Sequence, residues 1–142
     1  MSFEVIDTRY MGIEHAIACH RLGDVLIDPG PAASIDHVIE QLGDVVPRVL
    51  LLTHVHLDHA GGTGKLVEHY PELQVYVHEI GAPHMIDPTR LVASTSRTFG
   101  DAEARCRHRA GARRQALDRG HGEGGNGRPG NRLYATDRHA GE

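Results

Sequence analysis

The amino-acid sequence predicts an α/β fold for residues 1–100. Apolar segments with the composition of strands alternate with segments of helical periodicity, and this alternation is typical of layered sheets and helices. The segment at residues 49–52 is apolar at every position, as expected for a strand that is buried on both faces of a sheet. We therefore expect a mixed sheet with helices packed on one of its faces.

The expected elements follow one another in a regular order. Strands are predicted where short apolar or β-branched segments are bounded by glycine, proline or polar residues, at 3–10, 16–22, 24–28, 49–52 and 73–77. Two helices are predicted from apolar residues at helical spacing, at 34–42 and 63–70. Ser34 and Thr63 stand at the starts of these helices, where we expect their hydroxyl groups to act as N-caps.

The composition changes after residue 100. Residues 101–142 contain 9 arginines, 8 glycines and 7 alanines, but only Leu117 and Leu133 from the set Val, Ile, Leu, Met and Phe. Burial of two such side chains, at about 25 cal/mol per Å², cannot offset an ordering cost of roughly 1–2 kcal/mol per residue. We therefore expect this tail to be disordered and to lack a packed core. A GC-rich gene read in a shifted frame encodes such a composition, so we hypothesise a frame-shifted or truncated chain.

The bulk properties exclude several classes of protein. Residues 1–100 carry 6 basic and 13 acidic side chains, so they lack the basic surface that binding to a phosphate backbone requires. No apolar run approaches the roughly 20 residues of a membrane-spanning helix, and the start has no basic segment followed by an apolar one. Two cysteines, Cys19 and Cys106, do not make a disulfide framework. We expect a cytoplasmic protein with a small-molecule substrate, and no nucleic-acid or membrane partner.

Four side chains of metal-binding type follow the apolar strand at residues 49–52. They are His54, His56, Asp58 and His59, and two glycines come directly after the segment. His54 and His56 are two positions apart, so in an extended segment their side chains point the same way and can grip one ion. Open α/β sheets tend to place their sites at the carboxyl ends of strands, which is where this segment lies. A histidine-rich loop without function is the alternative interpretation.

The donor set indicates the kind of metal. Imidazole and carboxylate without thiolate suit zinc, iron or manganese in an open site, rather than a closed structural zinc site. A bound dication lowers the pKa of its water from about 16 toward about 7, which provides a hydroxide at neutral pH. The segment therefore predicts a metal-dependent hydrolytic chemistry.

At these residues the sequence resembles the metallo-β-lactamase superfamily. The pattern His-x-His-x-Asp-His is similar to the signature of that family, and Leu26-Ile27-Asp28-Pro29-Gly30 resembles its strand-ending Ile-Asp-x-Gly segment. The resemblance covers roughly residues 3–100 and is closest to the glyoxalase-II-like group of hydrolases. It implies an αββα sandwich, of which only the first half is recognisable here.

The resemblance also implies roles for individual residues. His54 and His56 match ligands of a first metal position, and Asp58 and His59 match those of a second, with Asp58 also orienting the attacking water. One or two zinc ions are implied, with iron or manganese as alternatives. Asp28 matches an acid that supports the metal-binding loop from behind, although a turn-forming aspartate before Pro-Gly is an alternative. The implied reaction is attack of a metal-bound hydroxide on an ester, thioester or lactone-type bond.

Part of the family pattern is missing. The family needs a third histidine for the first metal, an aspartate that bridges both metals and a last histidine, all in its second half. The only remnant is Thr136-Asp137-Arg138-His139-Ala140, in which His139 is a weak match for one ligand. We therefore expect the isolated chain to bind about one ion, weakly, and to hydrolyse test esters poorly. The absent half also predicts an exposed sheet face, through which two chains could form a homodimer.

Several alternatives remain open from the sequence. One is a catalytically inactive metal-binding fragment, and another is a metallo-nuclease of the same fold, against which the acidic charge argues. A third is a non-haem iron or flavodiiron-type role on this fold, which the identity of the metal would reveal. His78 and His84 follow the last predicted strand and are either residues of a substrate mouth or ordinary surface histidines.

Overall fold

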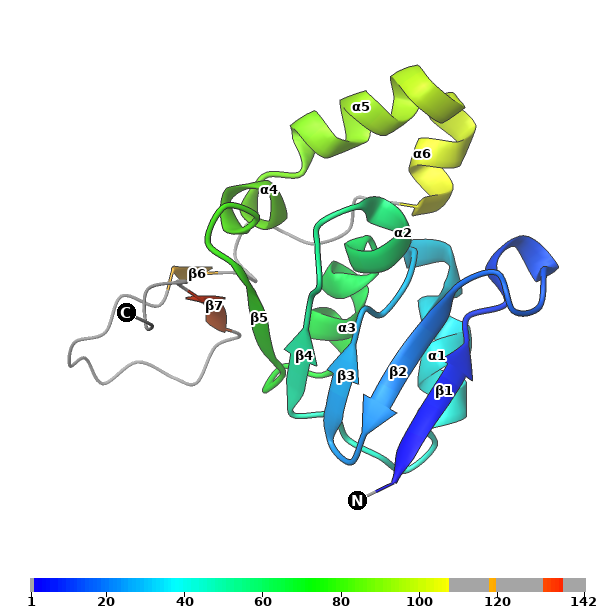
Figure 1. The fold of residues 1–142 in the computed structure, drawn as a ribbon, viewed down its shortest axis with the longest axis vertical. Helices are drawn as coiled ribbons and strands as arrows, with labels where there is room; N and C mark the ends of the chain where they lie inside the picture. The colour runs from blue at the N-terminus through cyan, green and yellow to red at the C-terminus, as the bar shows by residue number, and fades with distance from the viewer. Residues whose placement is uncertain (1, 108–117, 120–131, 137–142) are drawn as a thin grey trace, which may run out of the picture.

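The computed structural model describes residues 2–107, 118–119 and 132–136. In this part of the chain a single mixed sheet has the strand order β1-β2-β3-β4-β5-β7-β6 (Figure 1). The first two pairs, β1 with β2 and β2 with β3, are antiparallel, and every later pair is parallel. The strands are β1 (Phe3–Asp7), β2 (Ala18–Leu22), β3 (Val25–Ile27), β4 (Val49–Leu51), β5 (Gln74–His78), β6 (Asp118–Arg119) and β7 (Arg132–Thr136).

Helices cover one face of the sheet and one of its ends. In Figure 1, α1 and α3 lie behind the sheet, while α4, α5 and α6 lie above the carboxyl ends of β3, β4 and β5. None of the helices in the described ranges is long and apolar enough to cross a bilayer. The helices are α1 (Ile35–Leu42), α2 (Leu57–Ala60), α3 (Thr63–His69), α4 (Ala82–Ile86), α5 (Thr89–Phe99) and α6 (Asp101–Arg107).

The core lies between the sheet and the helices behind it. Leu26, Leu50 and Val75 stand side by side in the register of β3, β4 and β5, and all three are fully buried. They pack in one cluster with Ile35 of α1 and Leu66 of α3. The helical spacing of apolar residues in α1 and α3 thus serves to close this face of the sheet.

The other face of the sheet carries no described helix. Successive residues of a strand point to opposite faces of a sheet, whereas residues paired across strands point to the same face. Val5, Ile27 and Leu51 are connected by such pairs across β1 to β4, so all three lie on this open face. Val5 is 61% exposed and Leu51 39% exposed. The prediction of a mixed sheet with helices on one face is therefore confirmed, and residues 49–51 form a strand as expected.

The helix caps differ from those predicted. Ser34 precedes α1 but makes no side-chain cap bond, and Thr63 is the first residue of α3 rather than its cap. The Thr63 hydroxyl donates to the carbonyl oxygen of Ala60 at 2.7 Å instead, which ties α3 to the end of α2. Ser34 thus takes the predicted N-cap position without the expected hydroxyl bond, while Thr63 lies one residue inside its helix. The reason is that Ser34 and Gly62, the residues before the two helices, already have helical backbone angles.

The folded unit continues past residue 100. Helix α6 follows α5, Ala104 is buried, and the Tyr10 hydroxyl donates to the Glu103 carboxylate. The backbone of β7 pairs with β5, and that of β6 pairs with β7. Composition predicted the end of this unit at residue 100, and α6, β6 and β7 were not predicted from the sequence. The other tail residues lie outside the described ranges, so the predicted lack of a core there stays a prediction.

Candidate metal centre

The metal-binding segment lies where two parallel strands end. Strand β3 ends at Ile27 and is followed by Asp28, and the neighbouring β4 ends at Leu51, shortly before Thr53. Because β3 and β4 are parallel, both loops leave the same end of the sheet. His54 and His56 lie in the loop after β4, and the short helix α2 carries Asp58 and His59.

Asp28 holds this loop in place. Its Oδ1 accepts the backbone N–H of Thr53 at 2.8 Å, and its Oδ2 accepts the Thr53 hydroxyl at 2.5 Å. The same Oδ2 lies 3.1 Å from Nδ1 of His59. Asp28 is only 7% exposed and has a positive φ of 47°, a conformation that aspartate tolerates better than most residues. The carboxylate therefore joins the end of β3 to both parts of the metal-binding segment.

The backbones of the two loops are also bound to each other. The N–H of Gly30 donates to the carbonyl of His59 at 2.9 Å, and the N–H of Gly62 donates to the carbonyl of Gly30 at 2.9 Å. A Cβ atom at residue 62 would lie 2.2 Å from Cδ1 of the fully buried Ile35. The two loops therefore approach each other so closely at Gly62 that only glycine fits there.

The hydrogen bonds define which nitrogen of each ring is free. The Thr53 hydroxyl has one hydrogen, which it donates to the Asp28 carboxylate, so at 2.9 Å from Nδ1 of His54 it can only accept. His54 therefore carries its proton on Nδ1, and His59 donates its own Nδ1 proton to Asp28. Both rings keep an Nε2 lone pair for a ligand, as metal-binding histidines held by a carboxylate do.

The three histidines gather in one cluster. The ring centroids of His54 and His59 are 4.1 Å apart, and those of His54 and His56 are 4.8 Å apart. Asp58 joins the cluster through its Oδ2, which lies 3.7 Å from Nε2 of His59. His54 is thus nearer to His59 than to His56. The assignment of these residues to two metal positions stays a prediction.

Asp28 also lies close to the histidine cluster. One ligand atom from each of Asp28, His54 and His59 can be chosen so that all lie within 4.8 Å of one another. The oxygens of Asp28, however, already accept three hydrogen bonds. An orienting role for Asp28 therefore agrees better with the geometry than direct ligation, and this is the role that the resemblance implies.

The electrostatics keep His54 neutral. Partial burial, followed by the proximity of His59 and His56, lowers the pKa of His54 below its ordinary value of 6.5. Neutral imidazole is the form that binds metal, because the protonated ring has no lone pair. Three imidazoles and one carboxylate, partly exposed and without thiolate, therefore fit an open site for a divalent ion.

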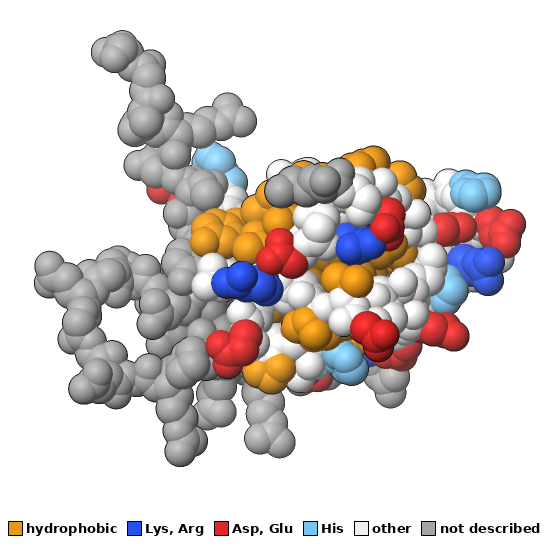
Figure 2. Space-filling view, turned by 90° about the horizontal axis from the view of Figure 1, so that it is seen from below, with side chains coloured by type: hydrophobic (Ala, Val, Ile, Leu, Met, Phe, Trp, Pro, Cys, Tyr) orange, Lys and Arg blue, Asp and Glu red, His pale blue; other side chains and the backbone are white. Residues whose placement is uncertain are grey.

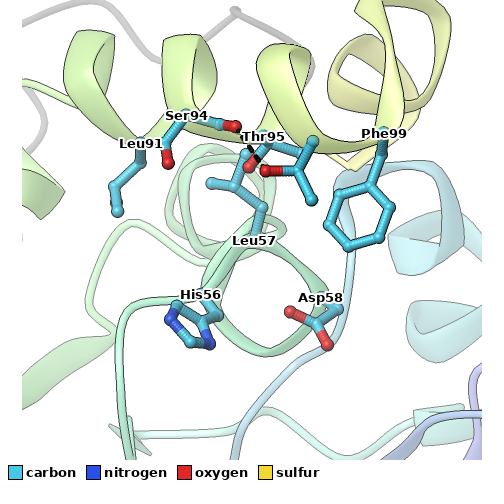
Figure 3. Close-up of a pocket in the computed structure, with 8 residues that line it drawn as sticks. His56, Leu57, Asp58, Leu91, Ser94, Thr95 and Phe99 are labelled. Carbon is cyan, nitrogen blue, oxygen red and sulfur yellow. Dashed lines mark hydrogen bonds between the residues drawn. The ribbon is translucent and has the colours of Figure 1, made fainter.

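A cavity of about 330 Å³ opens beside His56 and Asp58 (Figure 3). Helix α5 forms its opposite wall, which the sequence analysis missed. The sequence pattern that could have predicted α5 is an amphipathic segment between Pro88 and Gly100, because proline and glycine commonly mark the ends of helices. The lining residues are His56, Leu57, Asp58, Leu91, Ser94, Thr95, Thr98 and Phe99.

The remaining candidate residues lie elsewhere. His78 ends β5 and its Nδ1 accepts the N–H of Ile80 at 3.3 Å, while His84 lies in α4. Neither of them lines the cavity beside His56. His139 lies outside the described residues. A second hollow of about 470 Å³ lies at the opposite ends of β3, β4 and β5 and contains Arg48 and Glu72 but no histidine.

Comparison with known proteins now identifies the family. The family model of the metallo-beta-lactamase superfamily matches residues 17–139. The chain belongs to this superfamily. The resemblance in the metal-binding segment and the fold class expected from it are therefore both confirmed.

Individual members of the superfamily match only in part. This chain is 31% identical to a hydroxyacylglutathione hydrolase of Pectobacterium atrosepticum over 83 residues, which cover 56% of this chain and 33% of that relative. It is also 44% identical to the hydroxyacylglutathione hydrolase of Yersinia enterocolitica over 52 residues, which cover 37% of this chain and 20% of that relative. The chain thus spans a third or less of the length of these relatives.

A solved structure agrees with the fold. The BLEG-1 B3 metallo-beta-lactamase superposes with a TM-score of 0.52 at 24% identity, covering 70% of this chain and 46% of that one. At this identity the likeness concerns the fold alone. The sheet and the helices behind it are therefore arranged as in the fold of a metallo-beta-lactamase.

Proposed function

We propose that this chain contains the metal-binding part of a hydrolase that cleaves acyl thioesters. The observation that carries the proposal is the pair of imidazoles, His54 and His59, whose Nδ1 atoms are anchored through Asp28, for His54 by way of Thr53. This anchoring leaves the Nε2 atoms of both rings as the ligand atoms for an ion. The thioester class is supported by the hydroxyacylglutathione hydrolases among its relatives. Esters and lactones, whose acyl carbons are attacked in the same way, are the nearest alternatives.

His54, His56, Asp58 and His59 are the residues that would hold the ion. Zinc suits this donor set best, and iron and manganese suit it as well. When bound, a divalent ion supplies a Lewis acid and a coordinated water of lowered pKa. The Nε2 atoms of His54 and His59 would bind it, because the contacts of Asp28 and Thr53 with their Nδ1 atoms favour the required tautomer.

The protein residues then guide the chemistry. Asp58 lies beside His59 and the cavity, where its carboxylate accepts a hydrogen bond from the attacking water and orients it. The oxygen of that water would form a bond to the acyl carbon while one of its protons passes to the Asp58 carboxylate. The carbon–sulfur bond would then break as the leaving sulfur takes up that proton, and the second proton of the water is released to solvent. The products are a carboxylate and a thiol, and the cavity between α2 and α5 holds the substrate during this step.

Metal content and turnover of the full chain test this proposal together. We expect zinc to bind weakly, with a stoichiometry near one, and to support slow hydrolysis of an acyl-glutathione thioester. His54→Ala should weaken zinc binding more than about 100-fold, and Asp28→Asn about 10- to 100-fold, the usual range for a residue that orients a metal ligand. His84→Ala is the matched control, since His84 lies in α4 and does not line the cavity. Zinc affinity that is unchanged in His54→Ala would refute the proposal.

A catalytically inactive metal-binding fragment is the second candidate. It is favoured by the short alignments, which cover 33% and 20% of the relatives. Zinc binding that depends on His54, combined with no hydrolysis of thioesters, esters or lactones, would establish this candidate instead.

A nuclease that acts on RNA is less well supported. The face in Figure 2, at the end opposite to the histidine cluster, has blue basic side chains scattered among red acidic ones. Residues 1–100 contain 6 basic and 13 acidic side chains. Phosphate-backbone binding relies on contiguous basic surface, and this charge balance opposes it.

A further inference from the structure

Helices α4, α5 and α6 form an arch across the histidine cluster, from residue 82 to residue 107 (Figure 1). The arch begins shortly after β5 and ends where α6 contacts α2 and the short 3-10 helix at Ala32–Ser34. Its middle part, α5, lies across the cavity from His56 and Asp58. Every residue of α4 and α5 is described, and none of them is buried. Segments with so little buried surface open locally at a lower cost in free energy than the core does.

The two ends of the arch are fixed to the rest of the protein. At its start, Met85 and Ile86 of α4 pack against the hydrophobic core. At its end, Ala104 of α6 is fully buried, and the Tyr10 hydroxyl donates to a carboxylate oxygen of Glu103 at 2.5 Å. This hydrogen bond joins residues that are 93 positions apart. It therefore ties the far end of the arch to the loop between β1 and β2.

The loop between β1 and β2 is shaped to direct Tyr10 inward. Tyr10 is 6% exposed, whereas the next residue, Met11, is 67% exposed. Arg9 and Met11, on either side of it, have positive φ angles of 44° and 55°, which are unfavourable for residues other than glycine. The Asp7 carboxylate stabilises this conformation by accepting the N–H groups of Arg9 and His15 at 3.0 Å. Backbone strain of this kind persists only where the surrounding structure fixes it, and it is frequent at clamps and switches.

Gly100 gives the arch a joint between α5 and α6. Its φ of 89° and ψ of 161° form a combination that is almost restricted to glycine. A Cβ atom at this position would meet no atom within 4 Å, so close packing is not the reason for a glycine here. The reason is therefore the backbone conformation. Single residues at the ends of helices absorb the change of backbone angles when one rigid element moves relative to another.

We infer that Tyr10 and Glu103 form a latch that holds the arch closed across the histidine cluster. Neither residue lines the cavity, so both are positioning residues. While their hydrogen bond is intact, α6 is fixed and α5 keeps its place across from His56 and Asp58. When the bond breaks, α6 turns at Gly100 and α5 moves away from α2, which opens the cavity to solvent. The effect on turnover rests on the proposed hydrolase function, whereas the latch itself rests on the contacts of the arch.

Amide hydrogen exchange of the full chain, followed in the presence of zinc, tests the latch. Tyr10→Phe removes the hydroxyl group and keeps the ring. Exchange in α5 and α6 should become about 10- to 100-fold faster, the usual effect of losing a hydrogen bond to a charged group. Exchange in α1 and α3 should stay the same, because these helices pack against the sheet. Tyr76→Phe is the matched control, since the Tyr76 hydroxyl donates to Gln74 within β5 and not to the arch.

Variants of Glu103 test whether the two residues act as a pair. Glu103→Gln keeps an oxygen that can accept the Tyr10 hydroxyl, so it should accelerate exchange in α5 and α6 less than Glu103→Ala does. Adding Tyr10→Phe to Glu103→Ala should cause no further acceleration, because both changes remove the same bond. Three results would overturn the inference: unchanged exchange in α5 and α6, equal acceleration in α1 and α3, or additive effects of the two substitutions.

Hydrolysis of the acyl-glutathione thioester and zinc affinity are measured separately. Tyr10→Phe should leave zinc affinity unchanged, because Tyr10 contacts α6 and not the metal-binding segment. It should raise KM more than it lowers kcat, because a wall that is less often in place binds less substrate before the chemical step. A change in kcat alone would overturn the role in access. Faster exchange in α5 without any hydrolysis would reject the proposed function and retain the latch, and hydrolysis with unchanged exchange would do the reverse.

Discussion

Leu50 and Leu51 are neighbours in β4, yet Leu50 is fully buried and Leu51 is 39% exposed. The difference extends across the sheet, since Cys19, Leu26 and Val75 on the closed face are also fully buried, while Val5 on the open face is 61% exposed. Strand alternation makes this possible, because successive side chains point to opposite faces. One face thus supplies the stability of the sheet, and the histidine cluster depends on it through the loops that leave the same strands.

The largest effect should come from truncating the closed face. Leu50→Ala is expected to lower the free energy of unfolding by about 2–5 kcal/mol, because it leaves a cavity in a fully packed core. Leu51→Ala, one residue away, should cost less than about 1 kcal/mol, since its side chain already contacts solvent. Urea denaturation of both variants measures the difference. Equal losses would show that the open face is covered in solution.

The closed face also supports the metal-binding segment, and Gly62→Ala tests this support. The added methyl group would collide with Ile35 at 2.2 Å, and Ile35 is fixed in the core. We expect a loss of about 1–3 kcal/mol in stability, as for other overpacked sites. Zinc affinity should fall with it, because Gly62 donates to the carbonyl of Gly30, two residues beyond Asp28. A variant with native stability and native zinc affinity would contradict this connection.

The thiol of Cys19 lies on the closed face, and its reactivity tests whether that face stays closed. Burial, followed by the nearby charge of Asp28, raises the pKa of Cys19 to about 12. In a Cys106→Ser background, a thiol reagent at pH 8 should react slowly with the folded chain and rapidly in denaturant, because the thiolate is the reactive form. The unfolded thiol titrates near pH 9, so stability should fall as the pH rises from about 9 toward 12. Rapid labelling of the folded chain would show that the face opens.

The smallest effect concerns the open face, which we propose as a surface for pairing two copies of the chain. Leu51→Lys should shift sedimentation toward the monomer with little change in stability, because a charge replaces exposed apolar area. Val46→Lys is the matched control, since Val46 is 63% exposed and precedes the strand rather than lying in the sheet. A native chain that sediments as a monomer at all concentrations would rule out this dimer.

Local features of the sequence determined much of this protein. Each of the five strands within residues 1–100 needs only an apolar or alternating segment between breakers, so all five were predicted with shifts of a few residues at their ends. The four candidate ligands lie within six consecutive positions, and such short spacing identifies a donor set without knowledge of the fold. The family resemblance depended on the same short segments.

Contacts between distant residues were decided only by the tertiary structure. Asp28 and Thr53 are 25 positions apart, and Asp28 and His59 are 31 apart, so the tautomers of the histidines follow from the pairing of β3 with β4. Helix α5 could not be recognised as a wall of the site from its own pattern, because a helix with an apolar side can face a core, a partner or a cavity. The placement of α5 across from His56 and Asp58 resolved this choice, since it depends on packing against α2, α4 and α6.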